Sequence, residues 1–110
     1  MATPLLTEGA FIKTIASTAA PEAIAAAPFK VYSAIIQALP TNTGSVQVGD
    51  LAVDYTTGLG VRLAKPVADG TPASLVLSSS REGSREVDLS KYFVDVQVNG
   101  EGVSVLWSNS

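Results

Sequence analysis

Apolar and polar residues alternate from Tyr92 to Trp107, and this alternation constrains the fold more than any other feature of the chain. A period of two places every second side chain on one face of a β-strand. Asn99 and Gly100 interrupt the pattern with residues that accept the positive φ angles of a tight turn. The segment predicts a β-hairpin with one face in a shared core. The expected core residues are Val94, Val96, Val105 and Trp107.

Similar short apolar runs fill the chain from Phe29 onward, separated by turn signals rich in Gly, Pro, Asn and Asp. We expect one long strand or two short ones over residues 29–39, and further strands over 45–48, 51–55, 61–63 and 73–78. Residues 78–88 are expected to form a polar loop of mixed charge. This spacing predicts an all-β fold, a small antiparallel β-sandwich that is jelly-roll-like and has about seven or eight short strands. The sandwich domain is expected to span residues 29–110.

Residues 1–28 differ in composition, because they are rich in Ala and Thr and hold few large apolar side chains. Such a segment is either a partly disordered tail or an extended arm that becomes ordered on a neighbouring subunit. A short helix within it is a further possibility. Isolated apolar residues in a polar context favour the N-terminal arm. The residues expected to bind a partner through it are Leu5, Leu6, Phe11, Ile12 and Ile15.

The chain has no Cys and no His, which restricts the chemistry open to it. Without Cys, disulfides and thiolate metal sites are excluded. Without His, the side chain most used for proton transfer and the commonest zinc ligand are both missing. Asp50, Asp54 and Asp69 are not spaced as a calcium loop and are interpreted as turn residues. We therefore expect no enzyme and no catalytic, metal or cofactor site.

The charge and hydropathy patterns also exclude two classes of partner. The net charge is −3, and the seven basic residues form no stripe that could follow a phosphate backbone, so nucleic-acid binding is not expected. No run approaches the roughly 20 apolar residues that a membrane-spanning helix needs. A basic segment typical of a signal peptide is also missing before the Ala-rich stretch.

Short motifs follow one another in a fixed order along the chain: NTG at 42–44, VQVGD at 46–50, Gly58 or Gly60 with Leu63, YFVD at 92–95 and NGEGVSVL at 99–106. This ordered series resembles a small β module of tailed bacteriophages. The series covers roughly residues 42–107 and leaves out the first 28. The family usually has a tighter connection where this chain carries residues 81–88.

The resemblance implies a structural protein of the virion, namely a capsid decoration (cement) protein that binds and stabilises the phage head lattice. It implies two partners at the particle surface, the major capsid protein and copies of the chain itself as a homotrimer, because decoration proteins tend to sit at local threefold positions. Two other classes stay open. One is a tail, baseplate or fibre component, and the other is a carbohydrate-binding β module, which would need exposed aromatic side chains.

Overall fold

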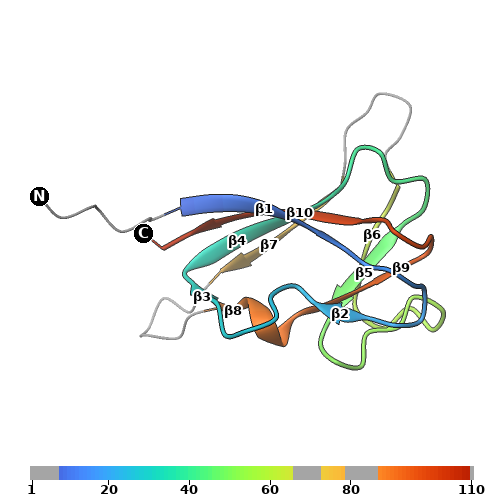
Figure 1. Cartoon of the computed structure of the whole chain (residues 1–110), viewed down its shortest axis with the longest axis horizontal. Helices are drawn as coiled ribbons and strands as arrows, with labels where there is room; N and C mark the ends of the chain where they lie inside the picture. Colours follow the sequence, from blue (N-terminus) through green and yellow to red (C-terminus); the bar gives the residue numbers. More distant parts are fainter. Residues whose placement is uncertain (1–7, 66–72, 79–86, 110) are drawn as a thin grey trace, which may run out of the picture.

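Two four-stranded antiparallel sheets lie face to face in the computed structural model, which describes residues 8–65, 73–78 and 87–109 (Figure 1). Sheet A consists, in spatial order, of β1 (Glu8–Thr14), β10 (Gly102–Ser108), β4 (Ser33–Ala38) and β7 (Ser74–Ser78). Sheet B consists of β2 (Glu22–Ala23), β9 (Phe93–Val96), β5 (Val46–Gly49) and β6 (Val61–Leu63). A short pair, β3 (Lys30–Val31) with β8 (Val87–Asp88), and the 3₁₀ turn η1 (Leu89–Lys91) complete the described elements. The predicted all-β sandwich is confirmed.

Four strand pairings within the two sheets are nested in the winding order of a jelly roll. The first and last strands of the two sheets pair, β1 with β10, and inside them β2 pairs with β9, β4 with β7, and β5 with β6. The chain thus forms one long folded-over ribbon whose successive strand pairs lie in sheet A, sheet B, sheet A and sheet B, with the short β3–β8 pair after the second. This is the double-sheet arrangement of two Greek keys.

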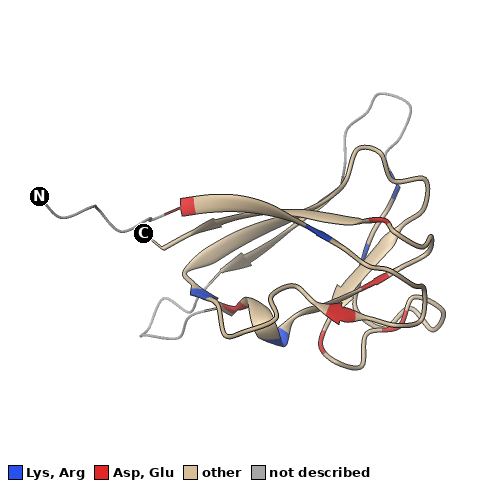
Figure 2. Cartoon of the chain, in the orientation of Figure 1, with Lys and Arg blue, Asp and Glu red and all other residues tan. Residues whose placement is uncertain are grey.

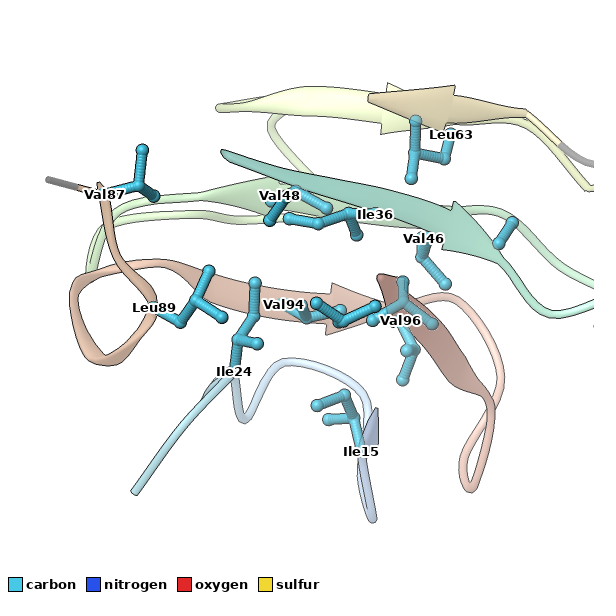
Figure 3. Close-up of a cluster of buried hydrophobic side chains, with 14 of the residues drawn as sticks. Ile15, Ile24, Ile36, Val46, Val48, Leu63, Val87, Leu89, Val94 and Val96 are labelled. Atoms are coloured by element: carbon cyan, nitrogen blue, oxygen red, sulfur yellow. The ribbon is translucent and has the colours of Figure 1, made fainter. Parts of the chain in front are cut away.

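The core lies between the sheets and is built from the inward side chains of both. Sheet A contributes Ile36 and Val105, and sheet B contributes Val94 and Val96, all fully buried. Figure 3 shows Ile36, Val94 and Val96 within this cluster. Trp107 packs against the same cluster at its margin. The core residues predicted from the alternation of 92–107 are therefore confirmed.

The predicted hairpin around Asn99 and Gly100 is wrong. Strand β9 pairs with β2 and β5 in sheet B, whereas β10 pairs with β1 and β4 in sheet A. The turn, in which Gly100 has a φ of 84°, carries the chain across the core from one sheet to the other. A period of two reports only that each strand has one buried face, and two strands that face each other across a core satisfy it as well as two that pair.

Residues 8–28 belong to the sandwich and do not form a separate arm. Strand β1 pairs with β10 along its whole length, and Ile15 and Ile24 are buried in the core. Gly102 permits the close approach of β1, since a Cβ at this position would collide with the Lys13 carbonyl oxygen. An edge strand needs only backbone pairing and one buried face, so few large side chains are sufficient. The described part of the chain begins at Glu8.

Two smaller expectations have different outcomes. Residues 29–39 form two strands, β3 and β4, so the alternative of two short strands is confirmed. The strand expected over 51–55 is wrong, because this segment is a loop in which Asp54 bridges to Leu59. The Asp50 and Asp54 carboxylates accept the backbone N–H groups of Ala52 and Thr56, so the turn interpretation of these two aspartates is confirmed. Asp69 lies outside the described residues, as does all of the expected 78–88 loop except Ser78, Val87 and Asp88, which belong to β7 and β8.

Candidate functional site: the outer face of sheet A

Sheet A turns a continuous row of apolar side chains away from the core. The strand register places Ala10 beside Leu106, Leu106 beside Ile35, and Ile35 beside Val76, so the row crosses all four strands. Ile36 and Val105 directly adjoin Ile35 and Leu106 in sequence and point into the core. Because successive side chains of a strand point to opposite faces, Ile35 and Leu106 point outward. We call Ala10, Leu106, Ile35 and Val76 the apolar row.

The apolar row is open to solvent. The exposed fractions are 63% for Val76, 52% for Leu106 and 40% for Ile35, and Ile12, one step along β1 from Ala10, is 64% exposed. Single exposed hydrophobic residues are common on soluble proteins, but a contiguous group on one face indicates a contact surface. The apolar row and Ile12 are therefore the candidate functional site.

On strands β10, β4 and β7, the rows on either side of the apolar row are polar and uncharged. One holds Ser108, Ser33 and Ser78 in register, and the other holds Ser104, Gln37 and Ser74. Strands β4, β7 and β10 contain no charged residue, and β1 has only Glu8 and Lys13 (Figure 2). Lys13 forms an ion pair with Glu22 of β2. Glu8 is thus the single charge among the outward positions of the described sheet A.

The outer face of sheet B has the opposite character. Its register aligns Arg62, Gln47 and Asp95 across β6, β5 and β9. Gln47 and Asp95 are each only 1% exposed, although both point away from the core. A polar row is buried here because segments of the same chain cover it.

Short hydrogen bonds fasten the connection between β5 and β6 onto this polar row. The Tyr55 N–H donates to Asp95 Oδ2 at 2.8 Å, and the Gln47 amide donates to the Gly58 carbonyl at 2.9 Å. Arg62 donates to the Tyr55 carbonyl at 2.8 Å and to Gln47 Oε1 at 3.0 Å, and its guanidinium lies 4.2 Å from the centre of the Tyr55 ring. The outer face of sheet B is thereby occupied from within the chain.

Acidic side chains elsewhere also anchor loops. Burial raises the pKa of Glu101, but hydrogen bonds from the Thr43 and Gly44 N–H groups and the Thr43 hydroxyl outweigh it and lower the pKa below 4.5. The Ser90 hydroxyl, then the Phe29 and Ser90 N–H groups, lower the pKa of Asp88 below 3.8. Glu101 and Asp88 therefore each hold a backbone segment in place, and these segments lie in different parts of the fold.

Glu22 does the same for the turn between β1 and β2. The Ala16 N–H donates to Glu22 Oε2 and Lys13 donates to Oε1, each at 3.0 Å. The hydrogen bond from Ala16 is the main reason that the pKa of Glu22 falls below 4.5, and Lys13 adds to it.

The structure separates the residues that the sequence predicted as partner-binding. Phe11 points inward and lies 6.0 Å from the Phe29 ring, and Ile15 is fully buried in the core. Ile12 points outward beside the apolar row, and Leu5 and Leu6 lie outside the described residues. Of the five, only Ile12 is seen on the candidate surface.

Sequence reasoning missed Ile35, Val76 and Leu106, although a signal for them exists. Each is flanked by apolar residues, as in the runs AII at 34–36, LVL at 75–77 and VLW at 105–107. A strand with one face in water should alternate apolar with polar, so unbroken apolar runs indicate that both faces are to be covered.

Within residues 8–65, 73–78 and 87–109, no helix is long and apolar enough to cross a membrane. The same residues bring no three His, Cys, Asp or Glu side chains together as ligands for a metal ion. Comparisons with models of protein families, with curated proteins and with solved structures find no match to this chain.

Proposed function

We propose that this chain is a structural protein of a phage particle, a capsid decoration protein that binds the head lattice and stabilises it. The observation that carries the proposal is the solvent-exposed apolar row on sheet A. Removing apolar area from water favours association by roughly 25 cal/mol per Å² before the costs of ordering are subtracted. A surface of this kind acts by adhesion and needs no catalytic group.

The winding of the chain supports the same proposal at the level of the fold. Jelly rolls are the architecture of many viral capsid domains and also of lectins. Such an analogy raises the expectation of a function without assigning one. It agrees with the resemblance of residues 42–107 to a phage β module.

The packing of most described aromatic rings weighs against the carbohydrate-binding alternative, and Tyr32 is a single exposed ring. Sugar binding needs rings that present a free face to solvent. The Phe29 ring instead lies 5.2 Å from Trp107 and 6.0 Å from Phe11, inside the sandwich. Tyr55 carries the Arg62 guanidinium on its face.

The proposed partners are the major capsid protein and further copies of the chain. Leu5 and Leu6 precede the edge strand β1 in sequence and supply the contact with coat subunits. The chain accordingly works at the surface of the particle, without nucleic acid, membrane or cofactor.

The number of copies of this chain in each virion distinguishes a head protein from a tail protein. Quantified protein bands of purified virions should give hundreds of copies for each particle if the chain decorates the capsid. A handful of copies would overturn the decoration proposal in favour of a tail, baseplate or fibre component. Absence from the particle would reject both.

Two truncations test the contact with the coat. Deletion of residues 1–7 should leave the sandwich folded and should weaken binding to purified heads, because it removes Leu5 and Leu6 but not β1. Deletion of residues 1–28 should abolish folding, since it removes β1, β2, Ile15 and Ile24. Circular dichroism and co-sedimentation with heads measure the two effects. Full binding by the shorter deletion would show that Leu5 and Leu6 do not make the contact.

A further inference from the structure

We infer that the outer face of sheet A pairs two copies of this chain, sheet against sheet, about a twofold axis parallel to the strands. The pairing is argued from the face alone and does not depend on the phage assignment. It also differs from the homotrimer that the resemblance implies. Its centre is the apolar row.

The low charge of this face favours a partner surface that is also uncharged. Glu8, at one corner, is the only charged residue among the outward positions of the described strands. A charged partner surface would lose its hydration there and find no opposite charge in exchange. A second copy presents the same neutral surface and is present wherever the first one is.

The strand register makes the face complementary to itself. A twofold axis between β10 and β4 sets Leu106 opposite Ile35 of the second copy and, at the edges, Ala10 opposite Val76 of the second copy. The same rotation sets Glu8 opposite Ser78, so no like charges meet. Aligned sheets in sandwiches cross at about 30°, which keeps the two central pairs in contact. An isologous interface of this type is the commonest one among homo-oligomers.

The size of the face sets the strength of the pair. Four strands about 4.8 Å apart and about six residues long, at about 3.4 Å for each residue, give a footprint of about 400 Å². Two such footprints make about 800 Å², below the roughly 1,200 Å² of standard stable complexes. We therefore expect a weak pair, with a Kd of about 1 µM or higher, that forms where copies are concentrated.

Analytical ultracentrifugation of the full chain from about 1 µM to about 1 mM tests the pairing. The wild type should pass from monomer to dimer within this range. The double variant I35K/L106K should stay monomeric, because four lysines would be buried at the centre of the pair. The control L51K/L59K changes two exposed leucines of the β5–β6 connection and should dimerise as the wild type does.

A second measurement does not depend on the folding of the lysine variant. The chain has no Cys, so Leu106→Cys introduces a unique thiol. Facing sheets lie about 10 Å apart, and a short bis-maleimide should link two L106C copies but not two L51C copies.

Three results would overturn the pairing: a wild type that is monomeric at the highest concentration, a trimer, or equal cross-linking of L106C and L51C. A monomeric wild type that binds heads through the apolar row, with binding lost in I35K/L106K, would assign the face to a coat subunit. That result would end the pairing but support the phage proposal. If the chain forms the dimer but is absent from virions, the pairing is supported and the phage proposal is rejected.

Discussion

The outer faces of the two sheets differ in a way that the shared core does not explain. Sheet B places a polar row, Arg62, Gln47 and Asp95, under loops of the same chain, and every contact of that row is internal. Sheet A places an apolar row in water with nothing from the described chain over it. A buried face that is polar therefore serves the fold, and an exposed face that is apolar remains for another molecule. The contrast separates residues that stabilise the monomer from residues that can bind.

The largest expected effect on stability comes from replacing Asp95, which lies in the polar row on the outer face of sheet B. Asp95 Oδ1 accepts the Ala19 and Val96 N–H groups at 3.0 and 2.9 Å, and Oδ2 accepts the Tyr55 N–H at 2.8 Å. Asp95→Ala should lower the free energy of unfolding by about 2–4 kcal/mol, since it leaves these donors without an acceptor. Urea denaturation followed by circular dichroism measures the change.

The matched control lies on the other face. Val76→Ala removes an exposed side chain of the apolar row and should change the free energy of unfolding by no more than about 0.5 kcal/mol. Equal losses in the two variants would abolish the distinction between the faces.

Low pH should destabilise the loops that are held by carboxylates and should leave the apolar row of sheet A unaffected. Glu22, Asp88 and Glu101 have pKa values below 4.5, 3.8 and 4.5 respectively in the folded chain, because hydrogen bonds stabilise their ionised forms. A lowered folded pKa contributes stability that is complete above the unfolded value and is lost as the pH falls through the folded one. The Tm should therefore be flat near neutral pH and should fall below about pH 4.5.

Glu101→Gln isolates one anchor in this profile. At pH 7 the variant should melt roughly 2–5 °C below the wild type, because an amide oxygen accepts these hydrogen bonds less strongly than a carboxylate. The gap should narrow as the pH falls through the lowered pKa of Glu101, because the wild-type carboxyl then also becomes protonated. A gap that is independent of pH would mean that the charge of Glu101 plays no part.

The smallest effect is a gain in stability at the edge of the covered face. Ala19 has a φ of 60°, a left-handed conformation that is unfavourable for a residue with a Cβ, and Asp95 accepts its N–H. Ala19→Gly should raise the free energy of unfolding by about 0.5 kcal/mol. Ala20→Gly, at the next position, should lower it by a similar amount, since there glycine only adds freedom to the unfolded chain. Thermal melts of the two variants test whether the strain lies at Ala19.

The inward faces of the strands could be predicted from the sequence, and the pairing of the strands could not. Burial of Val94, Val96 and Val105 follows from a period of two, because one methyl-rich side must leave water. The same period does not show which strand pairs with which. The sequence therefore predicts a hairpin at Gly100, whereas the turn in the structure connects the two sheets.

The misplaced boundary at residue 28 has a similar cause. Strand β1 is held largely by its backbone pairing with β10, a contact between distant segments that leaves little trace in local composition. The buried polar row of sheet B is equally hidden, since Gln47 and Asp95 resemble ordinary surface residues until the covering loops are known. Pairings remote in sequence decide these features, and no local pattern encodes them.

The position of β10 has a consequence for how the chain is made. Strand β10 lies between β1 and β4, yet it is translated after every other described strand. Until it emerges from the ribosome, β1 has no neighbour in sheet A and β4 has one open edge. Sheet A is therefore completed only after every other described strand has been made, and the remote pairing makes its closure slow compared with local structure. Newly made chains pass through a stage in which the edge of β4 is free to join the wrong strand, and a chaperone that shields open edges would act at that moment.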